Sequence, residues 1–132
     1  MELKPLHVGI SVNDIDSSIK WYNEILGFKT IFLKEIPMLS SKVAFLKNSD
    51  FEIELFEHSE TQSMPEGRRM PNEDIKVQGT KHICFSVLDI DEAFEFFREQ
   101  NVDVVFGPAL MEGEKMGFIR DPSGVLIEFI QR

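Results

Sequence analysis

The chain contains two stretches that resemble each other position by position. Residues 7–22 read HVGISVNDIDSSIKWY, and residues 82–97 read HICFSVLDIDEAFEFF. Without a gap, six of these sixteen positions are identical, at a constant offset of 75 residues. An internal repeat of this kind predicts two copies of one structural module, each with the same order of strands and helices.

Each copy begins with a predicted strand, at Leu6–Val12 and at Lys81–Val87. Apolar residues alternate with other residues in both, and successive side chains of a strand point to opposite faces of its sheet. One face therefore carries the apolar residues, and the other carries the histidines. The apolar residues are Val8, Ile10 and Val12 in the first copy and Ile83, Phe85 and Val87 in the second.

A helix is predicted after each of these strands. The first spans Ser17–Leu26, with Asp14 or Asp16 as its N-cap and Gly27 as the residue that ends it. The second spans about Asp91–Gln100. Apolar residues at helical spacing should pack both helices on the apolar strand faces, which leaves the histidine faces open. These residues are Ile19, Tyr22, Ile25 and Leu26, and then Ala93, Phe94 and Phe97.

Three more strands are predicted after each helix, which gives the order βαβββ twice. The predicted fold class is α+β, with residues 1–132 as one domain made of module one (1–57), a linker (58–79) and module two (80–132). The linker is rich in Glu, Ser, Pro, Arg and Asn and is predicted to be the least structured stretch. The strands are Phe28–Lys34, Lys42–Lys47 and Phe51–Glu57, and then Val102–Phe106, Lys115–Arg120 and Val125–Gln131.

Composition and charge exclude several classes of function. The net charge of −9 opposes binding to nucleic acid, which needs a basic patch, and binding to anionic lipid. No apolar run approaches the roughly 18 residues of a membrane span, and the N-terminus has no signal-peptide pattern. The single cysteine, Cys84, cannot form an internal disulfide. These features predict a cytoplasmic protein whose partner is a small molecule.

The two modules also share a glutamate on their last strand. Glu54 lies 47 residues after His7, and Glu128 lies 46 residues after His82. Apolar neighbours occupy the core-facing side around each glutamate, so both carboxylates should point to the histidine face. Two imidazoles and two carboxylates suit one divalent ion, namely Ni, Co, Zn, Fe or Mn, rather than calcium. The predicted metal ligands are therefore His7, Glu54, His82 and Glu128.

Four segments together resemble a known family. They are His7-Val-x-Ile-x-Val-x-Asp with Trp21-Tyr22, Glu54-Leu-Phe-Glu, His82-Ile-x-Phe-x-Val-x-Asp, and Asp121-Pro-Ser-Gly-x-x-Ile-Glu128. With them the chain resembles the vicinal oxygen chelate superfamily, the glyoxalase, bleomycin resistance and dioxygenase proteins. Its nearest branch contains glyoxalase I and methylmalonyl-CoA epimerase. The resemblance implies paired βαβββ modules that form a cup around a divalent metal, and a homodimer.

The resemblance also implies a reaction class. Ring-cleaving dioxygenases of the family use three of the four ligand positions, whereas glyoxalase I uses all four, as this chain does. It implies a metal-dependent isomerase or lyase that moves a proton through a metal-bound enediolate of a small α-oxygenated carbonyl compound. Glu128 is the first choice for the base that moves the proton, and Glu54 is the second. The alternatives are an acyl-CoA epimerase, a ring-cleaving dioxygenase and a non-catalytic protein that binds a small molecule such as an antibiotic.

Several other polar residues are candidates for substrate binding. Bacterial glyoxalase I carries an arginine that helps to hold glutathione, and Ser11 stands at that position here. Glu35 is expected at the surface end of a strand, and Cys84 is expected to be a small strand residue without chemistry. Arg68 and Arg69, in the linker, are expected to be solvated. The sequence assigns no substrate-binding residue.

Overall fold

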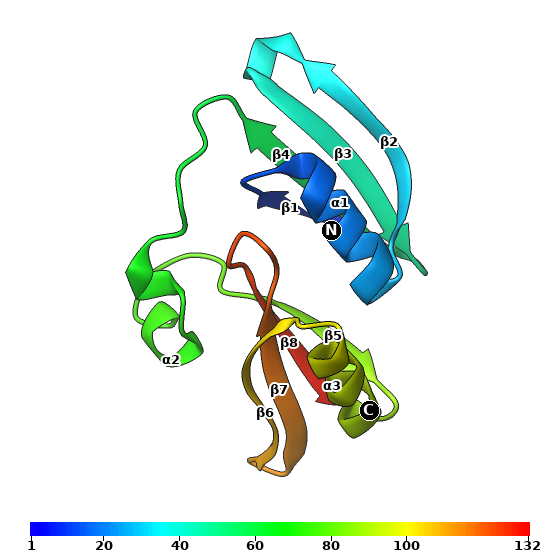
Figure 1. The fold of residues 1–132 in the computed structure, drawn as a ribbon, viewed down its shortest axis with the longest axis vertical. Coiled ribbons are helices and arrows are strands. Elements are labelled where there is room, and N and C mark those ends of the chain that lie inside the picture. Colours follow the sequence, from blue (N-terminus) through cyan, green and yellow to red (C-terminus); the bar gives the residue numbers. More distant parts are fainter. The chain divides into compact units, whose positions relative to one another are not determined.

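The computed structural model describes all 132 residues and divides the chain into two compact units, Met1–Ser63 and Met64–Arg132. Each unit contains one four-stranded mixed sheet with a helix packed on it (Figure 1). Within each unit the order of the main elements is βαβββ. The predicted duplication and the α+β fold class are therefore confirmed.

The first unit carries its sheet in the spatial order β1-β4-β3-β2. Strands β1 and β4 run parallel, and the other neighbours run antiparallel. Helix α1 packs against β2, β3 and β4. The elements are β1 (His7–Ser11), α1 (Ile15–Leu26), β2 (Lys29–Ile36), the 3-10 helix η1 (Pro37–Leu39), β3 (Ser41–Asn48) and β4 (Phe51–His58).

Helix α1 ends where the sequence predicts, but it begins at Ile15, two residues before the predicted start at Ser17, because Asp14 and not Asp16 is its N-cap. Asp14 is the N-cap, and its side chain accepts the backbone N–H of Ser17 at 2.8 Å. Gly27 ends the helix with a φ of 68°, a left-handed conformation that glycine adopts without steric cost. The buried face differs in part from the prediction, because Ile15 and Ser18 are buried with Tyr22 whereas Ile19, Ile25 and Leu26 are only half-buried.

Loss of the Asp14 cap gives a prediction with a defined pH dependence. The N–H of Ser17 holds the pKa of Asp14 below its ordinary value of 3.8. The cap is therefore fully effective above that pH and is lost as the pH falls through the lower folded-state pKa. We expect Asp14→Ala to lower the Tm by roughly 3–5 °C at pH 7 and by less near pH 2, as thermal denaturation would measure. Asp16→Ala is the control, and an equal loss in that variant would contradict the assignment of the cap.

The second unit repeats this arrangement with the spatial order β5-β8-β7-β6. Strands β5 and β8 run parallel, and helix α3 packs against β6, β7 and β8. Asp89 caps α3 as Asp14 caps α1, at the same offset of 75 residues. The elements are the 3-10 helix η2 (Glu66–Arg68), α2 (Pro71–Asp74), β5 (Ile83–Val87), α3 (Ile90–Glu99), β6 (Asp103–Met111), β7 (Glu114–Arg120) and β8 (Leu126–Gln131).

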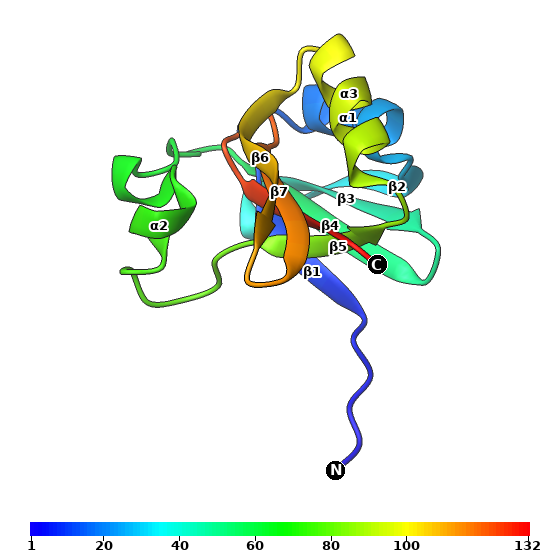
Figure 2. The same cartoon turned by 90° about the horizontal axis from the view of Figure 1, so that it is seen from below.

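The segment predicted as the linker between the modules contains two short helical elements. Strand β4 continues to His58, and the boundary between the units follows Ser63. The rest of the segment contains η2 and α2, and α2 lies apart from the β5–β8 sheet of its unit (Figure 2). Polar composition favoured a loop here, but buried ionic contacts of Asp74 fold the segment locally. The two short helical elements were not predicted, but the segment remains the stretch with the least regular secondary structure in the chain, as predicted.

Aromatic rings dominate the core of the second unit. Phe94 and Phe97 of α3 lie over Phe129 of β8, with ring centroids 5.1–6.1 Å apart. Gly117 of β7 leaves the room that Phe94 fills, because a Cβ at this position would lie 2.8 Å from Phe94 Cε1 and 2.9 Å from the carbonyl oxygen of Phe106. None of the helices of either unit is long and apolar enough to cross a membrane.

Candidate metal centre

In the first unit, the strand pairing brings His7 and Glu54 together. His7 is the first residue of β1, and Glu54 lies in β4, the strand paired parallel with β1. His7 Nε2 lies 3.3 Å from Glu54 Oε2, and both side chains are partly accessible. Ile53 and Leu55 on either side of Glu54 are fully buried, as the alternation of β4 requires. The carboxylate therefore points to the sheet face opposite α1, as predicted.

In the second unit, His82 and Glu128 form the equivalent pair. His82 Nε2 lies 2.9 Å from Glu128 Oε2, and the Glu128 side chain is only 14% exposed. Ile127 and Phe129, its neighbours in β8, are buried. Each predicted histidine thus meets the glutamate of its own module through the same pair of atoms.

A phenylalanine ring contacts each histidine in the same way. The His7 and Phe45 rings meet edge to face with centroids 5.2 Å apart and an interplanar angle of 84°. The His82 and Phe118 rings do so at 5.2 Å and 88°. The register places Phe45 beside Glu54 and Phe118 beside Glu128. The repeated ring contact restrains both imidazoles, so that the direction of Nε2 toward its glutamate does not depend on the ionic contact alone.

The residue beside each glutamate on the parallel strand differs between the units. Gly9 pairs with Glu54, whereas Cys84 pairs with Glu128. Burial, and then the charge of Glu128, raise the pKa of the Cys84 thiol to about 12. A thiol that stays protonated at neutral pH is a poor nucleophile. This agrees with the prediction that Cys84 is a strand residue without chemistry of its own.

The donor atoms present in each pair fit a divalent transition metal. An imidazole nitrogen and a carboxylate oxygen, 2.9–3.3 Å apart and partly accessible, are donors that Ni, Co, Zn, Fe and Mn accept. Neither unit by itself gathers three or more His, Cys, Asp or Glu side chains in one place. A four-ligand centre would therefore need both pairs, and His7, Glu54, His82 and Glu128 as its complete ligand set stay a proposal.

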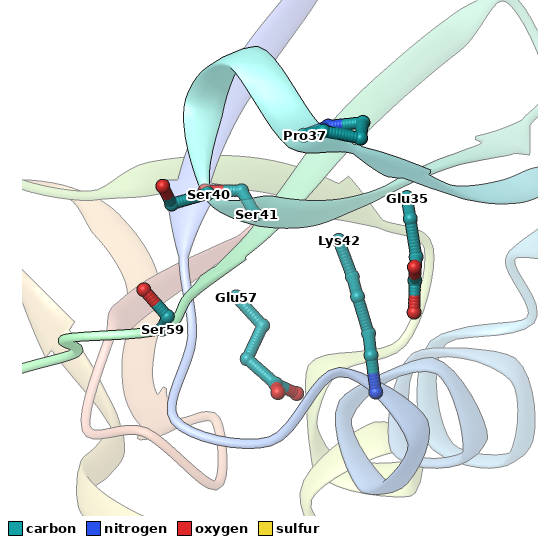
Figure 3. A pocket seen from close by; sticks show the side chains of 7 residues that line it. All are labelled: Glu35, Pro37, Ser40, Ser41, Lys42, Glu57 and Ser59. Carbon is teal, nitrogen blue, oxygen red and sulfur yellow. The ribbon is translucent and has the colours of Figure 1, made fainter.

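A separate cavity of about 430 Å³ lies at the other face of the first sheet, beside the start of α1 (Figure 3). Glu57 Oε2 accepts the backbone N–H of Ile15 there at 2.6 Å. Glu57 and Glu54 differ by an odd number of strand positions, so the cavity does not belong to the His7–Glu54 pair. Glu35 is exposed and lines this cavity, as expected for a residue near the end of its strand. The cavity is lined by Glu35, Pro37, Ser40, Ser41, Lys42, Glu57 and Ser59.

The role of Asp74 was not predicted from the sequence, and the prediction for Arg68 is wrong. Arg68 was expected to be solvated, but its Nε lies 2.9 Å from Oδ1 of the buried Asp74. The carbonyl oxygen of Arg69 accepts two hydrogen bonds from Arg120, at 2.9 and 2.6 Å. Only the acidic run Asn-Glu-Asp after Pro71 hinted at a helix in this segment, and it gave no sign that Asp74 is buried.

With this geometry, the duplicated module and its two His–Glu pairs define the class of protein. The chain belongs to the Glyoxalase/Bleomycin resistance protein/Dioxygenase superfamily, whose family model matches residues 4–129.

Within that superfamily, the chain is similar to several proteins named lactoylglutathione lyase or glyoxalase I. A lactoylglutathione lyase of Haemophilus influenzae is 32% identical over 96% of this chain and 90% of its own length. A lactoylglutathione lyase of Arabidopsis thaliana is 31% identical over 96% of this chain, which spans only 44% of that longer relative. Among solved structures, the trypanothione-dependent glyoxalase I of Leishmania major superposes with a TM-score of 0.75 at 27% identity, covering 98% of this chain and 87% of that one.

Proposed function

We propose that this protein is a metal-dependent isomerase or lyase of the glyoxalase I type, acting on a small α-oxygenated carbonyl compound. The observation that carries the proposal is the duplicated His–Glu pair, with Nε2–Oε2 distances of 3.3 and 2.9 Å in the two modules. The names of the relatives, lactoylglutathione lyases, support the same class.

His7, Glu54, His82 and Glu128 would hold one divalent ion, either Ni, Co, Zn, Fe or Mn. When bound, such an ion would polarise the substrate carbonyl and make the adjacent C–H bond more acidic. Residues of the chain orient the metal ligands and transfer the proton. Phe45 and Phe118 hold the imidazoles in direction through their edge-to-face contacts.

Glu128 is the proposed base. Its carboxylate accepts the proton from one substrate carbon and returns it to the neighbouring carbon, so the substrate isomerises without an external oxidant or reductant. Its side chain is 14% exposed, compared with 21% for Glu54. A less accessible carboxylate exchanges an accepted proton with water less readily, so it returns that proton to the substrate more often. This ranks Glu128 ahead of Glu54.

The first experiment measures metal binding by the three histidines of the chain. We expect the chelator-treated protein to regain close to one equivalent of Ni(II) or Co(II) per four-ligand centre. His7→Ala and His82→Ala should each weaken the binding at least about tenfold in calorimetry. His58→Ala is the matched control, because His58 Nδ1 already accepts the backbone N–H of Glu60 at 2.9 Å. Metal content below about a fifth of an equivalent, or an equal loss in the control, would refute the proposed centre.

The second experiment measures proton transfer. The metal-loaded protein is incubated in D2O with methylglyoxal and, in parallel, with glutathione, coenzyme A or no thiol. We expect a 2-hydroxyacyl thioester to form with one thiol, with partial incorporation of deuterium at the hydroxyl-bearing carbon, as NMR would show. A metal-replete protein that exchanges no C–H proton in any mixture would leave binding without catalysis as its function.

An acyl-CoA epimerase is the second candidate. The observation that favours it is Ser11, which is exposed on the histidine face of β1 and offers no positive charge to a glutathione carboxylate. The same D2O assay with a branched acyl-CoA distinguishes the two reactions. If deuterium entered the α-carbon of the acyl-CoA and no hemithioacetal were isomerised, the protein would be an epimerase.

We further propose that the working protein is a homodimer, in keeping with the family resemblance. Light scattering coupled to gel filtration would give its mass relative to the 15.2 kDa chain. Metal content per chain, measured on the same peak, would then give the number of centres in the assembly. A monomer that still holds a full equivalent of metal would contradict the dimer alone.

A further inference from the structure

An ionic cluster centred on Asp74 holds the segment that leads into β5. Asp74 lies in α2 and is 1% exposed. Its Oδ1 lies 2.9 Å from Arg68 Nε and 3.2 Å from Lys81 Nζ. Lys81 Nζ also donates to the carbonyl oxygen of Asp74 itself, at 2.8 Å. One carboxylate therefore joins residues from both ends of this segment.

The cluster also binds the backbone next to His82. Arg68 donates a second hydrogen bond, 2.6 Å long, to the carbonyl oxygen of Thr80. Lys81 Nζ donates a further bond to the carbonyl oxygen of Val77. The three donors of the Lys81 ammonium are thus all used. Thr80 and Lys81, the two residues before His82, are fixed by this network.

His82 needs such support more than His7 does. His7 belongs to the β1–β4 ladder, where it pairs with Glu52. In the second unit the β5–β8 ladder begins only at Ile83, so strand pairing does not orient the backbone of His82. Residues 1–6 of the first unit are exposed and extend away from β1 (Figure 2). Strand pairing therefore holds the backbone of His7, whereas the Asp74 cluster holds the backbone next to His82.

Burial of the Asp74 carboxylate costs stability, because the charged group loses its contact with water. Burial by itself would raise the pKa of Asp74, but the hydrogen bonds from Arg68 and Lys81 hold it below its ordinary value of 3.8. The carboxylate is then ionised at neutral pH, with Oδ2 buried and lacking any hydrogen-bond partner. Buried ionic contacts add little net stability on average, and one recognised use of them is to fix a single conformation.

We propose that Asp74 is a positioning residue for the second half of the metal centre. Through Arg68 and Lys81 it fixes the backbone that carries His82, and hence the direction of His82 Nε2 toward Glu128. This inference rests on the proposed function, because the histidine is positioned for a metal that the function requires.

The test compares Asp74→Asn with Glu73→Gln, two changes that each remove one negative charge from α2. Glu73 is exposed, and its side chain pairs with Lys76, two residues beyond the end of α2. We expect Asp74→Asn to weaken Co(II) binding about 10- to 100-fold and to alter the visible absorption bands of bound Co(II). Glu73→Gln should bind Co(II) within about twofold of the wild type, with an unchanged spectrum.

A metal-free measurement separates this inference from the proposed function. In 15N NMR spectra, Asp74→Asn should shift the imidazole signals of His82 and leave those of His7 in place. Unchanged His82 signals, or wild-type Co(II) affinity in Asp74→Asn, would overturn the positioning role. If the wild type bound no Co(II), the proposed function would fail and the NMR result alone would decide whether Asp74 orients His82.

Lys81→Gln provides a second variant in case Asp74→Asn does not fold. It removes one of the two cations of the cluster and leaves Asp74 and Arg68 in contact, and Lys76→Gln is its control. We expect Lys81→Gln to shift the His82 signals and weaken Co(II) binding in the same direction as Asp74→Asn. A Lys81→Gln variant identical to its control in both measurements would overturn the proposal.

Discussion

Replacing Glu128 with glutamine is expected to lower kcat for proton transfer by about 100- to 10,000-fold, the usual contribution of a general base. Glutamine keeps the shape and one carbonyl oxygen of the side chain, but it does not accept a proton at neutral pH. His82 would keep its contact with Phe118, so the geometry of this half-site should change little. The measurement is the rate of deuterium exchange into the substrate selected by the assay above, on protein with its metal content determined.

Glu54→Gln is the matched control, because Glu54 occupies the equivalent position of the first module. With Glu128 as the base, Glu54→Gln should lose metal affinity but retain proton exchange to within about tenfold once loaded with metal. The opposite order of the two variants would reassign the base to Glu54. Equal and small losses in both, at full metal content, would mean that neither carboxylate moves the proton.

Replacing Phe94 with alanine is expected to destabilise the protein by about 3–5 kcal/mol. Phe94 is fully buried, and its ring packs against Phe97 and Phe129 at centroid distances of 5.3 and 6.1 Å. Gly117 provides no side chain to fill the space that the ring leaves. The free energy of unfolding, extrapolated from urea denaturation, would measure the loss.

Phe96→Ala, two residues further along the same helix, controls for the removal of an aromatic ring from α3. Phe96 is 37% exposed, so its replacement should cost about 1 kcal/mol or less. Similar losses in the two variants would show that helix propensity or the unfolded state, and not the aromatic core, determines the effect. A loss below about 1 kcal/mol for Phe94→Ala would mean that the core closes over the missing ring.

The strands, the helices and the directions of the four proposed ligands could be predicted from the sequence. Alternation of apolar residues gives the face of each strand, and it placed His7 and Glu54 opposite the buried Ile53 and Leu55. Local capping chemistry gave the ends of α1, because Asp14 and Gly27 act through their own and neighbouring backbone groups. These features depend on residues close together in the chain, so one sequence contains the information for them.

Contacts between distant residues depended on the tertiary structure. The parallel pairing of β4 with β1, and of β8 with β5, decided which imidazole meets which carboxylate and at what distance. The ring contacts of Phe45 and Phe118 follow from strand register, which alternation of residues does not give.

The segment around Asp74 shows this difference most clearly. Its composition predicts a loop, and neither Arg68 nor Lys81 lies at a spacing that marks it as a partner of Asp74. The repeat in the sequence determined that the chain has two equivalent His–Glu pairs. The tertiary structure decided how each histidine is held, because Arg68 and Lys81 reach the buried carboxylate of Asp74 only in the folded chain.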